Sequence, residues 1–222
     1  MLQKSTLQFL TQLKKNNVKE WFDANRKVYE AAREDYGNLI SEVIKQTGKK
    51  DADIASLQLK DCMFRINRDV RFSKDKSPYK TNFGAFIVRG GKKSIYAGYY
   101  FHMEPGKSFV GGGLWMPMPE HLKKVRQEID YCYDEFSKIM KNKKFVATYG
   151  GLDKSAEYVL SRPPKGYDEE NPAIELLKMK SYVTTRPVTD AELLSKDLPK
   201  LIVSAFEALQ PMNAFINRAI ED

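Results

Sequence analysis

The sequence predicts an α+β fold: a single domain over residues 1–222, in which an antiparallel β-meander at about residues 62–115 is packed by N-terminal and C-terminal helices. Two observations lead to this prediction. Apolar residues recur every three or four positions in both outer parts of the chain, whereas they alternate with polar residues in the middle. No repeat, low-complexity tract or linker interrupts this order, and the chain is long enough to bury one substantial core.

Two helices are predicted before the sheet. Residues 5–8 have the spacing of a capping box, and leucines three residues apart then give a short amphipathic helix that ends near Asn16. Residues 17–20 have the same spacing, and they open one long amphipathic helix that runs to Gly48.

The pattern of residues in the central part of the chain predicts four consecutive strands. Alternation of apolar and polar residues begins at Cys62, and glycines and lysines at 90–93 give the turn of a hairpin. Because short turns connect the later strands, their pairing is expected to be antiparallel. The predicted strands are residues 62–67, 83–89, 94–102 and 108–115.

Helices dominate the rest of the chain. Pro117 and Pro119 precede a long amphipathic helix that runs to Met140. Glycine and proline clusters, including Arg186-Pro187, then mark loops around short strands at 158–161 and 181–185 and a short helix at 172–179. A capping box at 189–192 starts another short helix, and Asp197 is expected to cap a last helix with a kink at Pro211.

Composition narrows the class of protein. The chain has 37 lysines and arginines against 29 acidic residues, a net charge of +8, so phosphates, nucleic acids and acidic surfaces are plausible partners. Its two cysteines form no CxxC motif, which argues against a disulfide framework or a zinc cluster and fits a reducing compartment. No leader-like or membrane-spanning apolar run occurs, so the expected location is cytoplasmic, with no membrane partner.

The segment 65–80 is the main candidate for ligand binding. It carries six basic and two acidic residues, and arginines interspersed with aspartates can hold a planar fork for phosphate or carboxylate. The alternative is a solvated loop with an Arg–Asp ion-pair network. The candidate ligand-binding residues in this segment are Arg65, Asn67, Arg68, Asp69, Arg71, Lys74, Lys76, Tyr79 and Lys80.

His102 and Glu104 are the candidate catalytic pair. They occupy alternate positions of a predicted strand and so share a face, where the carboxylate could orient the imidazole or both groups could exchange protons with a substrate. The alternative is a hydrogen-bonded histidine beside a surface glutamate. Because His121 is the one other histidine and no spaced ligand set accompanies the pair, neither a metal nor a cofactor is expected.

Two further segments carry candidate site residues. Gly111, Gly112 and Gly113 could let a ligand approach the backbone closely, and the alternative is a bulge or a tight strand crossing. Arg162 and Lys165, in a rigid proline loop, could add positive charge to the same ligand site, although ordinary surface loops look alike. The Gly-Lys-Ser sequence at 106–108, which precedes the three glycines, lacks the spacing of a P-loop.

Several of these motifs together resemble a family of uncharacterised bacterial and fungal proteins catalogued as domain of unknown function 2461. The resemblance covers nearly the whole chain and implies a single domain, and it assigns no reaction, substrate or catalytic residue. The motifs that carry it are FRINRDVRFSKDKSPYKT at 64–81, YYFHMEPG at 99–106, GGGLW at 111–115 and RPPKGY at 162–167, with Phe9-Leu10 and residues 17–22.

The leading functional hypothesis is a basic cleft that binds an anionic small molecule, with proton transfer by His102 and Glu104 if the site is enzymatic. The first alternative is a nucleic-acid-binding module that uses the same basic segment together with stacking aromatic residues. The absence of a helix-turn-helix, zinc-finger or RNA-binding signature argues against it. The second alternative is a protein-interaction domain with no small ligand. The sequence predicts no oligomeric state.

Overall fold

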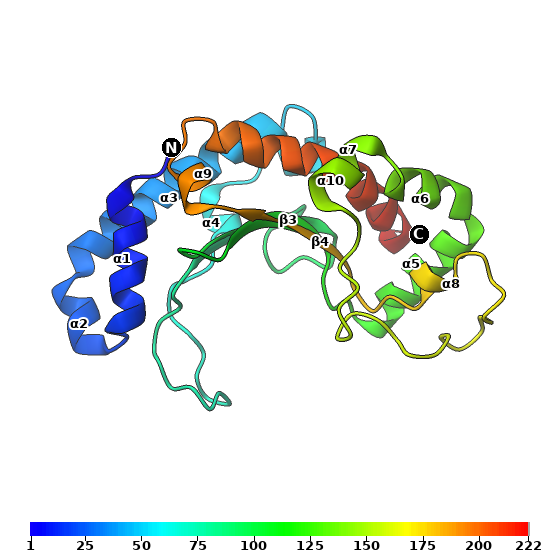
Figure 1. Ribbon diagram of the computed structural model, residues 1–222, viewed down its shortest axis with the longest axis horizontal. Helices are drawn as coiled ribbons and strands as arrows, with labels where there is room; N and C mark the ends of the chain where they lie inside the picture. Colours follow the sequence, from blue (N-terminus) through cyan, green and yellow to red (C-terminus); the bar gives the residue numbers. More distant parts are fainter. Residues whose placement is uncertain (222) are drawn as a thin grey trace. The chain divides into compact units, whose positions relative to one another are not determined.

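The computed structural model describes residues 1–221, and within that range it has ten α-helices, one 3-10 helix and a four-stranded sheet (Figure 1). The strand order in the sheet, β1-β2-β3-β4, follows the chain, and the strands are antiparallel. The predicted α+β fold class with an antiparallel meander is therefore confirmed. The strands are β1 (Phe83–Ile87), β2 (Gly98–Met103), β3 (Ser108–Leu114) and β4 (Tyr182–Val188).

The chain divides into two compact units. The first unit consists of Met1–Lys92, Tyr100–Val110 and Pro187–Ser204, and the second consists of Lys93–Tyr99, Gly111–Arg186 and the chain from Ala205 onward. Strands β2, β3 and β4 and helix α10 (Leu198–Glu221) contribute residues to both units. The sequence-based division, one domain over residues 1–222, stays a prediction.

The first unit begins with three helices that differ from the two predicted ones. The predicted capping box at residues 5–8 is wrong, because Gln3 is the N-cap of α1 and no side chain caps it locally. Instead, the Gln3 N–H and the Thr6 hydroxyl both donate to the Asp35 carboxylate, at 2.8 and 2.5 Å. A carboxylate from another helix thus supplies the negative charge that a helix N-terminus favours. The helices are α1 (Lys4–Lys15), α2 (Lys19–Ala24) and α3 (Arg26–Thr47).

The long helix predicted over 17–48 is interrupted at Asn25. This residue has φ −107° and ψ 17°, outside the helical region, and its side-chain amide donates to the Trp21 carbonyl at 2.9 Å. Such local side-chain hydrogen bonds compete with the helix, which explains the break. Asn17 does not act as a helix cap; its side chain instead binds a distant strand-like segment, described with the site below.

Aromatic packing against the sheet forms the core of the first unit. The fully buried ring of Tyr36 on α3 stacks on Phe83 of β1 and on Phe101 of β2, with centroid distances of 5.4 and 6.0 Å. Its hydroxyl donates to the Phe101 carbonyl at 2.9 Å, so the polar atom of the buried Tyr36 side chain has a hydrogen-bond partner. Two short helices and one 3-10 helix complete this unit: η1 (Ala52–Ile54), α4 (Leu59–Cys62) and α9 (Asp190–Leu193).

The strand predicted at 62–67 is mostly absent. Cys62 ends helix α4, and the following residues pair with the rest of the chain at two isolated bridges, Met63 with Ala85 and Asn67 with Tyr79. In residues 62–67, the alternation of apolar and polar residues therefore marks a segment with one buried face. It does not mark a strand with continuous hydrogen bonding to a neighbour. The capping box predicted at residues 189–192 is confirmed, because the side chains of Thr189 and Glu192 cap each other's backbone.

The second unit packs helices on the other part of the sheet. The predicted helix at 119–140 is broken at Cys132, and Phe136 packs edge-on against Tyr182 and tilted against Phe215. The predicted loop at Arg186-Pro187 is wrong, because both residues belong to β4; β4 is an edge strand, where proline is tolerated. The helices are α5 (Pro119–Tyr131), α6 (Tyr133–Met140), α7 (Lys143–Tyr149) and α8 (Ile174–Leu177).

Within residues 1–221, no helix has both the length and the apolar composition needed to cross a membrane.

The three glycines of β3 make room for its neighbouring strands. A Cβ atom on Gly111 would lie 2.1 Å from the Thr184 carbonyl oxygen of β4, and one on Gly113 would lie 2.0 Å from that of Tyr182. On Gly112 it would lie 2.1 Å from the Gly98 carbonyl oxygen of β2. These contacts are with backbone, so no rotamer change relieves them. The tight approach of strands by itself accounts for the three glycines.

Gly111→Ala should therefore destabilise the protein by about 3 kcal/mol or more, because a backbone clash must be relieved. Gly106 provides a matched control: its φ of +76° strains alanine, but no atom beyond its two chain neighbours lies within 4 Å of its Cβ position. Gly106→Ala should cost only about 1–2 kcal/mol. Urea unfolding of both variants checks this, and equal midpoints would contradict the role given to the strand contact.

Candidate functional site

Residues 67–79 form a projecting loop, here called the finger (Figure 1). Backbone hydrogen bonds close its base: Arg68 N–H donates to the Pro78 carbonyl at 2.9 Å and Lys80 N–H to the Ile66 carbonyl at 2.8 Å. The Asn17 side chain adds a second attachment, since its amide donates to the Tyr79 carbonyl at 2.9 Å and its oxygen accepts from the Tyr79 N–H at 3.1 Å. The Tyr79 ring stacks on Phe22 at 4.0 Å, which also attaches the finger to α2.

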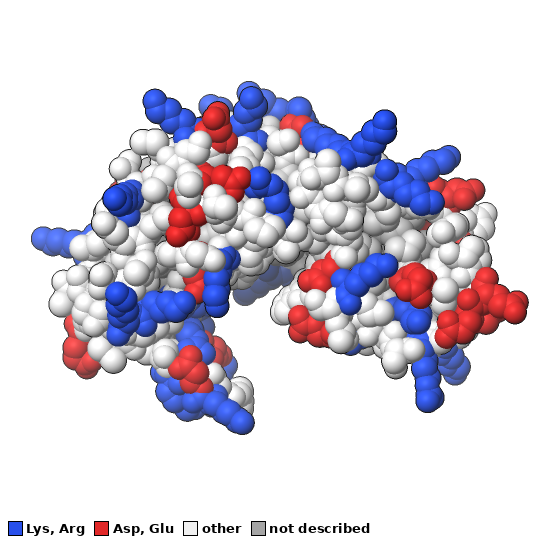
Figure 2. Space-filling view, in the orientation of Figure 1, with Lys and Arg blue, Asp and Glu red and all other residues white. Residues whose placement is uncertain are grey.

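Two arginines of the finger are already paired with carboxylates. The Arg71 guanidinium donates from Nε and Nη2 to the two oxygens of Asp69, at 2.9 and 2.7 Å. Arg68 donates to Asp75, to the Ser77 carbonyl and to the Ser73 hydroxyl. These contacts form the Arg–Asp network that the sequence offered as the alternative to an anion site. Figure 2 shows the mixture of blue and red atoms on the finger.

Hydrogen bonds from Ser77 also stabilise the negative charge of Asp75. The Ser77 hydroxyl and N–H donate to Asp75 Oδ1, at 2.6 and 2.9 Å, and with Arg68 they lower the pKa of Asp75 to about 2. Lys76 donates from Nζ to the Val70 carbonyl at 3.0 Å. The charged residues of the finger thus hold its own shape, and Asn67 joins its base through the bridge to Tyr79.

Arg65 and Lys80, at the base of the finger, differ from the arginines within it. Neither forms an ion pair with a residue in the described range 1–221. Lys80 is half-buried, with Nζ 5.3 Å from the centre of the Phe64 ring. Burial, and then the charge of Arg65, lower the pKa of Lys80. Asp69, whose pKa Arg65 also helps to lower, is already occupied by Arg71. Positive charge is therefore unbalanced here.

Strand β2 presents three polar side chains on the face opposite Phe101: Tyr100, His102 and Glu104, which follows the end of the strand. The Tyr100 hydroxyl lies 3.3 Å from His102 Nδ1, and His102 Nε2 lies 3.5 Å from Glu104 Oε2. The His102 and Glu104 side chains are each 16% exposed, so both keep access to solvent. The Phe109 ring of β3 stacks on the imidazole at 4.7 Å, with an interplanar angle of 8°.

The residues between Lys80 and β1 complete this group. Asn82 Nδ2 lies 3.4 Å from His102 Nδ1, and the Thr81 hydroxyl donates to Glu104 Oε1 at 3.3 Å. Lys14 of α1 reaches the same Glu104 oxygen at 3.5 Å. The His102 cluster, as used below, comprises Thr81, Asn82, Tyr100, His102, Glu104 and Phe109.

The partners of His102 fix its tautomer. The Glu104 carboxylate only accepts hydrogen bonds, so a neutral imidazole carries its proton on Nε2 and leaves the Nδ1 lone pair facing Tyr100 and Asn82. Burial lowers the pKa of His102, and the hydrogen bond and charge of Glu104 partly oppose this. Burial also raises the pKa of Tyr100 to about 12, so its hydroxyl stays protonated and donates. At neutral pH the imidazole is uncharged and able to take up a proton.

The unbalanced cations and the His102 cluster adjoin each other in the first unit. Lys80 immediately precedes Thr81 and Asn82, and the Phe64 ring beneath Lys80 lies edge-on to Tyr100 at 6.4 Å. Gly84 makes room for this arrangement, since a Cβ there would lie 2.6 Å from the Tyr100 hydroxyl. The structure thus places two cations that have no ion-pair partner among residues 1–221 near the group around the His102 imidazole.

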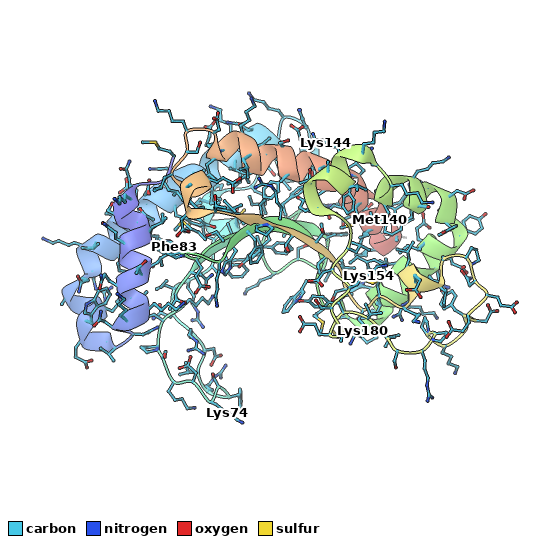
Figure 3. All side chains as sticks on the ribbon, viewed as in Figure 1. Lys74, Phe83, Met140, Lys144, Lys154 and Lys180 are labelled. Atoms are coloured by element: carbon cyan, nitrogen blue, oxygen red, sulfur yellow. The ribbon has the colours of Figure 1, made fainter. Side chains whose placement is uncertain are left out.

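The other predicted site residues either make no contact with the His102 cluster within the first unit or lie in the second unit. Lys74 is exposed at the far end of the finger (Figure 3), and Arg162 and Lys165 are exposed in the second unit, so a shared site with Arg162 and Lys165 stays a prediction. The Gly111–Gly113 backbone faces neighbouring strands, as described above. Within residues 1–221, no set of three or more His, Cys, Asp or Glu side chains could hold a metal ion.

Several members of the site were not singled out from the sequence. Tyr100 shares the alternation that placed His102 and Glu104 on one face, so the signal for it was present. Asn82 and Thr81 precede the neighbouring antiparallel strand, and their approach depends on the register between β1 and β2. Lys14 and Phe109 come from other elements, and no local pattern indicates them.

The pKa of His102 should lie below 6.5, and Glu104→Gln should lower it further because the anionic partner is removed. The unfolded chain then binds the proton more readily than the folded one. The stability contributed by the neutral ring is thus complete above about pH 6.5 and is lost as the pH falls through the folded-state pKa. NMR titration of the two imidazoles, assigned with His121→Gln, measures this; an unchanged or raised pKa in Glu104→Gln would contradict it.

A family model matches most of the chain. No curated protein and no solved structure matches the chain. The family described as "Conserved hypothetical protein (DUF2461)" matches residues 5–215, a span that includes the finger, the His102 cluster and the glycines of β3. Over nearly its entire length, therefore, the chain belongs to the DUF2461 family.

Proposed function

We propose that the first unit binds a small anionic molecule, a phosphate or carboxylate compound, at Arg65 and Lys80, and that His102 exchanges a proton with it. The observation that carries this proposal is the adjacency of two cations without ion-pair partners in the described range to a half-buried, uncharged imidazole. A negatively charged group is the ligand that such a pair of cations favours.

Electrostatics supports an anion at this place. Lys80 is held near a like charge and partly removed from water, and both effects disfavour its charged form. An anion between Lys80 and Arg65 would relieve the repulsion. The Phe64 ring under Lys80 attracts the Lys80 ammonium, but this cation–π contact is weaker than an ion pair.

The His102 cluster supports proton transfer to or from the bound molecule. The imidazole has a carboxylate on Nε2 that stabilises the protonated ring, and Tyr100 supplies a hydroxyl on Nδ1. This arrangement of a base oriented by a carboxylate and in contact with a hydroxyl is typical of acid–base and nucleophilic sites. The contacts of 3.3 and 3.5 Å are long, as such contacts often are before a ligand is bound.

An anion that binds at this site should raise the unfolding temperature. Thermal unfolding with a panel of inorganic phosphate, sugar phosphates, nucleotides and carboxylates should reveal at least one such compound, since a ligand at about 100 times its Kd adds ~2.7 kcal/mol of stability. The double variant Arg65→Gln/Lys80→Met should abolish the shift, because it removes both charges while keeping most of the side-chain volume.

Matched variants separate this site from the general positive charge of the chain. Arg71→Gln removes a cation that already has its carboxylate, so the shift should remain. His102→Asn should also retain the shift, since the imidazole is assigned to proton transfer and not to charge neutralisation. The proposal fails if no anion stabilises the protein or if the double variant responds like the natural chain. The former result, together with no binding of nucleic acid, would favour a protein-interaction domain.

A further inference from the structure

The tip of the finger exposes an aromatic ring. Phe72 is 96% exposed, which makes it the most exposed of the large apolar side chains in the described range. Its neighbours in the chain are polar: Arg71, Ser73 and Lys74 are followed by Asp75. Exposed single apolar residues are common, but a phenylalanine held almost entirely in water at the end of a projecting, basic loop is not explained by packing.

The finger is braced so that this ring stays outside. Arg68 crosses the loop to Ser73, Asp75 and the Ser77 carbonyl, and the Lys76 ammonium reaches back to the Val70 carbonyl. These contacts lie on both sides of Phe72 and none involves its ring. The loop is thus held by its own polar groups, with its base fixed by Asn17. A preorganised loop loses little conformational entropy when it binds a partner.

The residues around Phe72 are suited to a ligand that carries phosphate groups and planar rings. The Arg71 guanidinium, fixed by Asp69, lies 5.9 Å from the centre of the Phe72 ring, so two planar groups stand together at the tip. Lys74 extends from the end of the finger without an ion pair in residues 1–221 (Figure 3). Aromatic rings that stack on bases, next to cations that contact phosphates, are the elements with which proteins bind single strands without sequence preference.

We propose that the finger binds single-stranded nucleic acid, with Phe72 stacked on a base and Lys74 in contact with the backbone phosphates. The net positive charge of the chain, +8, favours the same partner. This proposal is independent of the anion site at Arg65 and Lys80, because it uses different residues at the opposite end of the finger.

A lipid bilayer fits the tip less well. Insertion of Phe72 into hydrocarbon would bring Asp69 and Asp75, which stabilise the loop as carboxylates, close to an apolar phase and to anionic headgroups. A base stacked on the ring does not bring these carboxylates close to an apolar phase, since the polar edge of the base remains among polar groups. In addition, one apolar side chain at the end of the finger provides too little apolar area to anchor a protein to a membrane.

Fluorescence anisotropy with a labelled oligothymidylate of about 20 nucleotides tests the proposal. Phe72→Ala should raise the Kd about fivefold or more through loss of stacking, and Phe72→Trp should restore or tighten binding. Lys74→Gln should reduce the slope of log K against log salt by about 0.7, one phosphate on a single strand, between about 50 and 200 mM salt. Since neither the Phe72 ring nor the Lys74 ammonium takes part in the hydrogen bonds that brace the loop, these variants leave the fold in place.

Control measurements give each outcome a meaning. Arg65→Gln/Lys80→Met serves as the control for positive charge away from the tip: it removes two charges, and it should weaken binding through charge alone without changing the ratio between the Phe72 variants. Vesicles containing phosphatidylserine test the rival surface. The proposal is overturned if the oligonucleotide does not bind, if Phe72→Ala binds as well as the natural chain, or if the vesicles bind and the oligonucleotide does not.

Discussion

Burial of Phe101 against Tyr36 is the interaction on which the first unit depends. It fixes which face of β2 meets the helices, and because side chains alternate along a strand, it also fixes the outward direction of Tyr100, His102 and Glu104. A slip of one residue would bury the imidazole and the carboxylate and expose the aromatic core. The hydrogen bond from the Tyr36 hydroxyl to the Phe101 carbonyl adds a polar contact that only one register satisfies. The site is therefore a consequence of how the core packs.

Much of the fold follows from local patterns in the sequence. The change from helical to alternating periodicity gave the fold class and three strands of the meander, and the capping box at Thr189 marked its helix correctly. Two of the errors lie where distant residues decide. Asp35 replaces a local cap on α1, and Pro187 lies inside an edge strand whose pairing could not be known from the sequence. The break at Asn25 instead comes from a local hydrogen bond of its own side chain to the Trp21 carbonyl.

For the site, the sequence identified the relevant segments better than the roles within them. His102 and Glu104 lie together as alternation predicts, and the basic segment is a distinct structure. Composition could not distinguish Arg68 and Arg71, which aspartates a few residues away neutralise, from Arg65 and Lys80, which have no such partner among residues 1–221. That difference depends on the fold of the loop. Similarly, three consecutive glycines gave no indication whether a ligand or a neighbouring strand comes close, and the structure shows the strand contacts.

The self-contained bracing of the finger separates its end from the sheet that carries it. Since Arg68, Asp75 and Ser77 bond to one another and the base is held by Asn17, the side chains at the tip contribute little to the stability of the rest. Sequence variation at Phe72 and Lys74, whose side chains take no part in these hydrogen bonds, should therefore cost little stability, and it would alter partner preference without disturbing the imidazole on β2. The same property makes this loop a suitable place for grafting a foreign peptide or a spectroscopic label.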